Sequence, residues 1–487
     1  MIQPSTPGRV SVGDHYGKRH ELDLGQCPYY GVVKNPSYLE ETPKRLGSDW
    51  IVERLQNGRQ LALHRIGHEG TWFVVDMSEM QGEVINLDQL RDLQPEVVSL
   101  VAADDDSRSF QIKVETTNYR ALRKAQWNPN GVCALVGPNG SGKTTLLTLL
   151  EFFRNAFLRN APVAMDQMGG AYGLRSWNSN AEVPVSVALS VGGQRWQLEL
   201  TTQGSTLTSK LGETVTDAGE IVLSRPPWGR QFFYRGKDIP IEANDDRMAI
   251  RIVAESSVGD EFHRFADMVK TIRVYRSYNI WSLQTNGSRQ GGDLYLHPSG
   301  QNLFTVLRNW RDRRDLKPNY QFVVNQMREA FPEVFSDLDF HVAGLTVTVD
   351  VIDPHTNACP LALAPDGVIT GLLHLTALAG AVPSSFIAID DFGNDLHPYA
   401  IRQLVSAFRD WAEIHNLTIC LASHSPVLLD EFKEQPSSVF VMEHGLENRP
   451  VPLTDLFEED WLSRFSLGQL YEYGEFGGQL ARPKAVE

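Results

Sequence analysis

The sequence has few cysteines and lacks long apolar runs, which argues against secreted, membrane-spanning and zinc-finger proteins. Its four cysteines lie far apart and form no CxxC pair, so neither the usual zinc spacing nor a disulfide framework is present. The N-terminal segment has no apolar signal core, and no stretch approaches about 18 uninterrupted apolar residues. We therefore expect a cytoplasmic protein that does not associate with a membrane.

The sequence also has fewer basic residues than acidic ones. Lys and Arg number 45 against 60 Asp and Glu, which gives a formal net charge of −15. This balance argues against a surface coated with non-specific nucleic-acid contacts. A local basic groove remains open, and residues 308–317 ("RNWRDRRDLK") are one candidate, although a solvated helix face of mixed charge is the commoner structure for such a segment.

Length and composition predict an ordinary globular chain with more than one part. The 487 residues favour two or three domains, or one large domain with insertions, and 42% of them are hydrophobic. Residues 1–108 predict a β-rich accessory domain, because their short apolar runs are broken by Asn-Gly and Glu-Gly turns. An acidic linker, 102–109, follows.

Beyond the linker, apolar patterns alternate between strand and helix periods. The last third in particular alternates helix and strand, which predicts a mostly parallel sheet with helices on its faces. The expected strands are 111–118, 131–137, a hairpin over 184–202, 344–352, 385–390, 417–422 and 438–443. The expected helices are 144–158, 260–272, 302–314, 321–331, 370–381, 397–415 and 426–433.

A phosphate-binding loop lies between the strand 131–137 and the helix 144–158. "GPNGSGKTT" fits the pattern G-x-x-x-x-G-K-[ST], and its position between strand and helix is the context that this motif requires. Glycines allow successive N–H groups to point at phosphate oxygens, and the helix N-terminus adds positive charge. The motif predicts ATP binding, with Lys143 at the β- and γ-phosphates and Thr144 on Mg²⁺. The loop residues are Gly137, Pro138, Asn139, Gly140, Ser141, Gly142, Lys143, Thr144 and Thr145.

Two adjacent acids follow a second apolar strand. In "FIAIDD" we expect Asp390 to hold Mg²⁺ and Asp391 to polarise the attacking water. Solvated turn residues are the alternative for such a pair, but the phosphate loop and the following strand, which ends at His424, favour the catalytic interpretation. Lys143 and Asp390 are too far apart in sequence for a minimal P-loop domain, so something is inserted between them.

From about 110 to 445 the sequence resembles the ABC-type AAA-family ATPases of the RecF/SMC/OLD group, particularly those of bacterial defence loci. The motifs that carry the resemblance are the opening strand with its turn at Tyr119 and Arg120, "DDFGNDLHP", and "SHSP" at 423–426. The resemblance implies an α/β fold: an ABC-type nucleotide-binding domain with a mixed sheet and an antiparallel β arm. It predicts an ATPase domain over 109–445, an inserted α+β region at about 205–330 in place of a coiled coil, and a docking tail over 446–487.

The resemblance also implies roles for single residues. Arg120 would lie near the phosphates, His424 would sense the γ-phosphate, and Asp395 would lie in the loop that faces a partner subunit. Asp366 and Gly367 would form what remains of the signature loop that reaches the partner's nucleotide. Gln284 is a weaker candidate for the glutamine that contacts Mg²⁺ and its water.

Two departures from the family pattern predict slow hydrolysis. Pro365 stands where the signature serine belongs, so a hydroxyl and an N–H are missing. Asp391 replaces the usual glutamate and is shorter by about 1.5 Å, one carbon–carbon bond. A displacement of about 1 Å at such an acid costs on the order of 10²-fold in rate.

These features predict an ATP- and Mg²⁺-binding ATPase that forms a homodimer or larger homo-oligomer. It would act as a nucleotide-gated sensor or scaffold in an antiviral defence system, with the effector on a separate polypeptide, since no nuclease signature is visible. A RecF-like DNA-repair ATPase and a non-hydrolysing structural subunit are the alternatives. Nucleic-acid binding remains possible, but the charge does not indicate it.

Overall fold

The computed structural model describes residues 112–478, apart from 177–182, 203–208, 228, 242–245, 257–258 and 445–447, and eight short strands between residues 9 and 96. The chain divides into two compact units, Met1–Arg108 and Ser109–Glu487. The predicted linker at 102–109 and the last nine residues of the predicted tail lie outside the described residues.

In its described part, the first unit consists of antiparallel strands in two sheets. This agrees with the β-rich character expected from its alternating apolar runs. One sheet has the order β2-β1-β8, from β1 (Arg9–Gly13), β2 (Arg19–Asp23) and β8 (Gln94–Glu96). The other has the order β3-β7-β6-β5-β4, from β3 (Tyr30–Lys34), β4 (Arg45–Leu46), β5 (Trp50–Arg54), β6 (Gln60–Ile66) and β7 (Thr71–Asp76).

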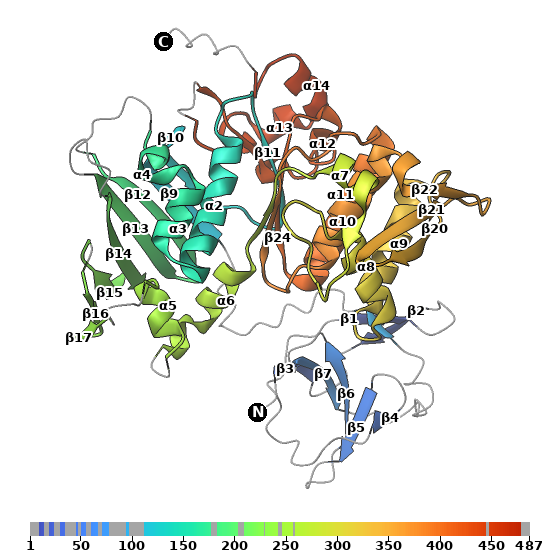
Figure 1. Cartoon of the computed structure of the whole chain (residues 1–487), viewed down its shortest axis with the longest axis horizontal. Helices are drawn as coiled ribbons and strands as arrows, with labels where there is room; N and C mark the ends of the chain where they lie inside the picture. Colours follow the sequence, from blue (N-terminus) through green and yellow to red (C-terminus); the bar gives the residue numbers. More distant parts are fainter. Residues whose placement is uncertain are drawn as a thin grey trace. The chain divides into compact units, whose positions relative to one another are not determined.

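A six-stranded sheet forms the centre of the second unit (Figure 1). Its order is β18-β23-β24-β11-β25-β26; the first five strands are parallel and β26 runs antiparallel to β25. The strands are β11 (Val132–Val136), β18 (Arg273–Tyr275), β23 (Phe386–Ile389), β24 (Thr418–Ser423), β25 (Val439–Val441) and β26 (Val451–Pro452). The predicted parallel sheet is therefore present, and its strands come from segments far apart in sequence.

An eight-stranded antiparallel sheet forms the second layer, in the order β10-β9-β12-β13-β14-β15-β16-β17. Its strands are β9 (Ile112–Tyr119), β10 (Leu122–Trp127), β12 (Val185–Val191), β13 (Gln194–Thr202), β14 (Ser209–Asp217), β15 (Glu220–Arg225), β16 (Gln231–Tyr234) and β17 (Lys237–Pro240). The boundary predicted near residue 205 does not end this arm, because β14 to β17 continue it. Residues 273–275, also inside the predicted insertion, form the edge strand of the parallel sheet.

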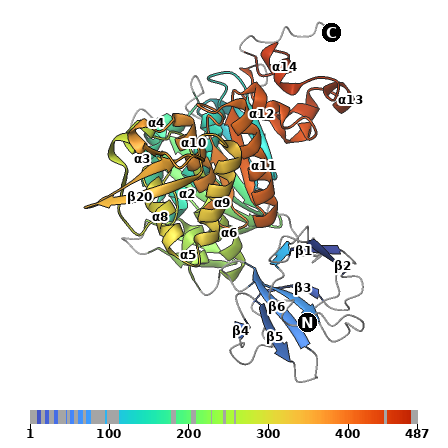
Figure 2. The same ribbon diagram turned by 90° about the vertical axis from the view of Figure 1, so that its right-hand side faces the viewer.

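Helices cover both faces of the parallel sheet (Figures 1 and 2). Between the two sheets lie α2 (Lys143–Leu158), α3 (Ala161–Gln167), α4 (Gly170–Leu174), α5 (Ala249–Ala254) and α6 (His263–Thr271). On the other side lie α7 (Ile280–Asn286), α8 (Leu303–Asp312), α9 (Lys317–Ala330), α10 (Asp366–Ala379) and α11 (Pro398–His415), with a small sheet of β19 (Ser288–Arg289), β20 (Asp337–Ala343), β21 (Thr346–Ile352) and β22 (Ala358–Pro360). Towards the C-terminus follow α12 (Pro426–Asp430), α13 (Glu459–Leu462) and α14 (Leu467–Glu472).

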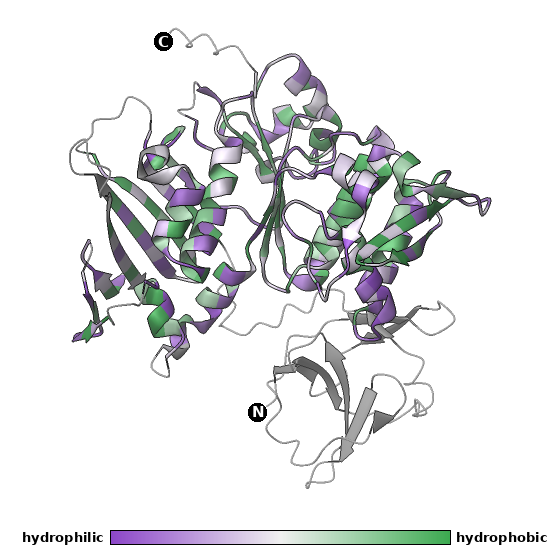
Figure 3. Cartoon of the chain, in the orientation of Figure 1, coloured by the Kyte–Doolittle hydropathy of each residue, from purple (hydrophilic) through white to green (hydrophobic). Residues whose placement is uncertain are grey.

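Alternate residues of the central strands belong to two different cores. In β11, Cys133 and Leu135 pack with α2 and the antiparallel sheet, whereas Ala134 and Val136 pack with the helices on the opposite side. A strand buried on both faces has to be apolar throughout, which explains the uninterrupted apolar runs and the hydrophobic centre in Figure 3. Each large aliphatic side chain buried in this way contributes about 1.5–3 kcal/mol.

Candidate nucleotide-binding site

The predicted site residues meet at the carboxyl edge of the parallel sheet. The phosphate loop follows β11, the acid pair follows β23, and His424 follows β24, and these three strands are neighbours in the order β23-β24-β11. Parallel strands present their carboxyl ends at one edge, where ligands of open α/β sheets bind. The fold thus joins two motifs that the sequence separates by more than two hundred residues.

The backbone of the phosphate loop depends on glycine at three positions. Gly137, Gly140 and Gly142 have φ of 150°, 78° and 102°. A Cβ on Gly137 would lie 2.0 Å from the carbonyl oxygen of Met442, and one on Gly142 would lie 3.0 Å from Leu122 Cδ2. The loop is therefore held between the β9–β10 turn and the segment after β25, with no room for a side chain at Gly137 and little at Gly142.

Helix α2 begins directly after this loop, at Lys143. Its N-cap, Gly142, offers no capping side chain, and its first turn carries no acidic residue. The first N–H groups of the helix therefore have no intrahelical or side-chain partner, and the helix dipole adds partial positive charge to them. The Lys143 ammonium lies over the loop and donates to the carbonyl oxygens of Gly137 (2.7 Å) and Pro138 (3.2 Å).

The structure brings together the two predicted magnesium ligands. Thr144 Oγ1 donates to Asp390 Oδ2 at 2.7 Å. Burial raises the pKa of the Asp390 carboxyl above its ordinary value, against the opposing hydrogen bond from Thr144. Burial also lowers the pKa of Lys143, against the attraction of Asp390 and Asp391. Burial thus disfavours the charged forms of Asp390 and Lys143. A bound cation would stabilise the Asp390 carboxylate, and a bound phosphate would stabilise the Lys143 ammonium.

The residues fit a nucleotide with its magnesium ion. Hydroxyl and carboxylate oxygens are the ligands that Mg²⁺ takes from a protein, and adjacent ligand oxygens at about 2.1 Å from the metal lie about 3 Å apart, close to the Thr144–Asp390 separation. Ser141 Oγ is buried in the loop without a hydrogen-bond partner. A bound phosphate would accept from it and from the free N–H groups of α2.

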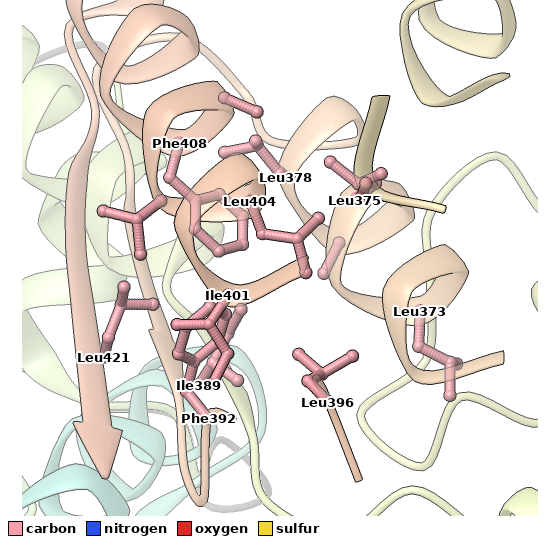
Figure 4. Packing of buried hydrophobic residues seen from close by; sticks show 14 of the residues in the cluster. Leu373, Leu375, Leu378, Ile389, Phe392, Leu396, Ile401, Leu404, Phe408 and Leu421 are labelled. Carbon is pink, nitrogen blue, oxygen red and sulfur yellow. The ribbon is translucent and has the colours of Figure 1, made fainter. Parts of the chain in front are cut away.

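Asp391 lies beside this pair and is exposed to solvent. It has φ 56°, so the chain turns immediately after Asp390, and its own N–H donates to Asp390 Oδ1 at 3.2 Å. The turn is anchored by Phe392, whose N–H donates to the carbonyl of Ala422 at 2.9 Å and whose ring packs in the core with α11 (Figure 4). The anchoring fixes where the Asp391 carboxylate leaves the backbone.

His424 lies within electrostatic reach of Lys143 and Asp391. Burial and the nearby Lys143 ammonium lower its pKa, and Asp391 opposes this shift. Its Nδ1 lies 3.2 Å from the hydroxyl of Tyr471, a residue of α14. No sequence pattern indicated this contact, although a docking tail was predicted over 446–487. The described residues up to 478 pack on the domain, with Leu467 and Phe476 fully buried.

Arg120 lies in the turn between β9 and β10, next to the phosphate loop. Its backbone has φ 47°, and its N–H donates to the carbonyl of Leu174 at 3.0 Å. Its neighbours Ala121 and Leu122 come within 3.7 Å and 3.0 Å of the place where a Cβ on Gly142 would lie. The turn that carries Arg120 therefore packs against the phosphate loop at Gly142.

The remaining signature residues form a second group. Helix α10 begins at Asp366, four residues before the predicted start, with Pro365 as its N-cap. Gln284 donates to Asp366 Oδ1 (2.8 Å) and to the carbonyl of Ala364 (3.0 Å). The Gln284 amide is thus bound to the start of α10 rather than to Thr144 and Asp390. A Cβ on Gly367 would lie 2.6 Å from the carbonyl oxygen of Asp395, so the signature and the Asp395 turn are in contact.

A family model described as "AAA domain, putative AbiEii toxin, Type IV TA system" matches residues 132–430, more than half of the chain. The chain belongs to this AAA-domain family. The match runs from β11 to α12 and contains the phosphate loop, both acids and His424. The predicted membership of the AAA family and the predicted α/β P-loop fold, with its mixed sheet and antiparallel arm, are confirmed.

No curated protein matches the AAA-family chain. Among solved structures, it is similar to three SMC head domains, each over 66% of this chain and 91% of the other chain. They are an SMC head bound to the C-winged helix domain of ScpA (9% identity, TM-score 0.38), the SMC head domain from Thermotoga maritima (14%, 0.29), and an SMC head with an extended coiled coil bound to the C-terminal domain of ScpA derived from Pyrococcus furiosus (10%, 0.38).

The basic segment 308–317 of the AAA-family chain carries acids beside its arginines. Arg308 and Arg311 pair with Asp312 at 3.6 Å and 3.0 Å, and Arg313 pairs with Asp315 at 2.8 Å. The two aspartates offset two of the five positive charges in this segment, which leaves a helix face of mixed charge. None of the helices in the described part of the chain combines the length and apolar character that a membrane crossing needs.

Proposed function

We propose that this AAA-family domain binds ATP with Mg²⁺ at the carboxyl edge of its parallel sheet and hydrolyses it slowly. On this proposal the nucleotide acts as a gate. ATP holds two or more copies of the chain together, and the assembly serves as the sensor or scaffold of a prokaryotic antiviral defence complex with a separate effector protein.

The observation that carries the proposal is the Thr144–Asp390 contact of 2.7 Å beside Lys143 and the open N-terminus of α2. When ATP·Mg²⁺ is bound, the ion draws electrons from the phosphate oxygens. Lys143 and the N–H groups of α2 would hold the phosphates, Thr144 and Asp390 would hold the ion, and Asp391 would orient a water. His424 would donate to the γ-phosphate.

Slow turnover follows from the two departures in the site. The Asp391 carboxylate leaves an anchored turn and is one methylene short of the position that a glutamate would reach. Pro365 caps α10 without offering a hydroxyl or an N–H to a phosphate. A long-lived ATP state suits a sensor or a scaffold better than it suits a motor.

Two observations support assembly with partners. The start of α10 is flanked by exposed apolar side chains, Leu363 (75% exposed) in the helical turn η3 (Leu361–Leu363) and Trp281 (72% exposed) in α7. Asp366, Gly367 and Gln284 have their contacts around the start of α10 and with the Asp395 turn. On this proposal their surface is left for the nucleotide site of a second copy. The family description names a putative toxin of a type IV TA system, and this supports a second protein as partner.

Replacement of Lys143 by alanine tests the nucleotide site. We expect ATP·Mg²⁺ to bind at least about 10- to 100-fold more weakly, because charge-assisted hydrogen bonds to phosphate contribute about 1.5–3 kcal/mol. Titration calorimetry measures the affinity, and Lys433→Ala, at an exposed lysine outside the site, is the matched control. Unaltered ATP binding by Lys143→Ala would refute the proposal.

A further inference from the structure

We propose that Tyr471 is a positioning residue that holds His424 in a single tautomer, so that its Nε2–H is available to the third phosphate. This inference rests on the proposed function and adds a role for the C-terminal segment, residues 466–478. The segment would make the site distinguish ATP from ADP.

The hydrogen bond between Tyr471 and His424 has a favoured direction. The two atoms, Tyr471 Oη and His424 Nδ1, are 3.2 Å apart. A phenol is a good donor and a poor acceptor, whereas the unprotonated nitrogen of a neutral imidazole is a good acceptor. The favoured arrangement therefore has the tyrosine hydroxyl donating to Nδ1. Since a neutral imidazole carries one proton, that proton is then on Nε2.

The electrostatic surroundings of the His424 ring favour its neutral form. Burial raises the pKa of Tyr471, which keeps the hydroxyl protonated. Burial and Lys143 lower the pKa of His424, which favours the neutral ring. A neutral ring with the proton on Nδ1 would turn the Nε2 lone pair towards a phosphate oxygen and repel it. Tyr471 therefore selects the tautomer that attracts the phosphate.

Hydrogen bonds and a close contact anchor α14 against the turn that carries His424. Asp430 Oδ1, at the end of α12, accepts from the N–H of Gly468 (2.9 Å) and from Ser466 Oγ (2.6 Å). A Cβ on Gly468 would lie 2.5 Å from the carbonyl oxygen of Pro426, two residues after His424. Figures 1 and 2 both place α14 beside α12. The tyrosine is thus carried by a helix packed directly on the SHSP turn.

The C-terminal segment has a second anchor beside the phosphate loop. The N–H of Gly477 donates to the buried Glu443 carboxylate, in the segment after β25. A Cβ on Gly477 would lie 2.5 Å from Tyr471 Cε2 and 3.6 Å from Gly137 Cα. The chain therefore crosses the edge of the Tyr471 ring and reaches the first glycine of the phosphate loop. The C-terminal segment therefore contacts both motifs that would bind the phosphates, the phosphate loop and the turn that carries His424.

The test compares ATP·Mg²⁺ and ADP·Mg²⁺ affinities of the full chain by titration calorimetry. Tyr471→Phe keeps the ring and its packing and removes only the hydroxyl. We expect ATP·Mg²⁺ to bind about 3- to 10-fold more weakly, the effect of one misdirected hydrogen bond, while ADP·Mg²⁺ affinity stays within about twofold. Tyr473→Phe, at a residue of the same segment that is 81% exposed, should leave both affinities at the wild-type values.

A double-mutant cycle separates positioning from a general structural effect. In a His424→Ala background, Tyr471→Phe should no longer change the ATP affinity, because its partner is gone. Equal weakening of both nucleotides by Tyr471→Phe, an effect that persists without His424, or an unchanged ATP-to-ADP ratio would each overturn the inference. If the wild-type chain binds ATP and Lys143→Ala does not, such a result leaves the proposed function intact. If the wild-type chain binds neither nucleotide, both proposals fall.

Discussion

At the scale of single residues, the proposed slow hydrolysis depends on the length of one side chain. Asp391 follows the metal-side acid in a left-handed turn that aspartate tolerates better than most residues do. The same choice leaves its carboxylate about 1.5 Å short of a glutamate's reach. The residue is therefore suited to the turn and poorly suited to positioning a water.

Asp391→Glu should raise the rate of ATP hydrolysis by about 10- to 100-fold, since about 1 Å of misplacement costs on the order of 10²-fold. The measurement is steady-state phosphate release at saturating ATP·Mg²⁺. Asp391→Asn is the control that keeps the short side chain and removes the charge; its turnover should fall below that of the parent. No gain in Asp391→Glu would mean that a step other than water activation limits the rate.

Residue identities at the sheet edge could be predicted from the sequence, whereas contacts between distant segments could not. The phosphate loop, Asp390 and His424 each follow an apolar strand, and parallel strands bring such positions together. The family resemblance offered Gln284 as a weaker candidate for contact with the metal, but side-chain contacts bind it to Asp366. Tyr471 reaches His424 only because α14 folds back on α12, and no local pattern encodes this contact.

At the scale of elements, helix α10 connects the signature surface with the acid turn. His374, in the middle of α10, is fully buried between Tyr278 and Phe392, with ring centroids 5.5 Å and 5.1 Å away. Neither of its ring nitrogens has a hydrogen-bond partner. Burial lowers the pKa of His374 to about 3 and raises that of the Tyr278 hydroxyl, so both groups facing each other are neutral.

Acid should therefore destabilise the chain through His374. Unfolded chains bind a proton on this histidine below about pH 6.5, whereas the folded chain binds it only near pH 3, so stability falls as the pH drops through this window. Between pH 7 and pH 5 the loss is about 2 kcal/mol. His374→Leu should reduce the acid-induced loss by that amount in urea unfolding, and His355→Leu, at an exposed histidine, should not. Equal losses in all three proteins would show that other groups carry the acid sensitivity.

Most helices and strands could be predicted because their apolar periods are regular. The helix 397–415 and the strand 417–422 appear as α11 and β24 within one residue. The antiparallel arm was predicted only as far as residue 202. Of the strands beyond it, β15 to β17 are short and their side chains are largely exposed or half-buried. Strands of this kind are specified by their neighbours in the sheet more than by their own pattern.

At the scale of the whole molecule, the proposed gate requires two copies to meet over the nucleotide. Leu363 and Trp281 flank the signature group, and aromatic and apolar side chains of this kind form the buried centre of interfaces. Burial of so small an apolar patch contributes only a modest free energy of association. A nucleotide bound between the two copies therefore has to contribute the rest. The association should then depend on ATP and not on protein concentration alone.

Mass measurement by light scattering should thus show at least a doubling of mass with ATP·Mg²⁺ and none with ADP·Mg²⁺. Leu363→Asp should bind ATP normally yet stay at the mass of the nucleotide-free protein, because it places a charge in the interface where the two copies meet. Ile414→Asp is the matched control: this residue of α11 is 67% exposed but lies outside the signature group, so the variant should still assemble. If Leu363→Asp assembles as the control does, the copies meet through another surface, and the signature group is not part of the gate.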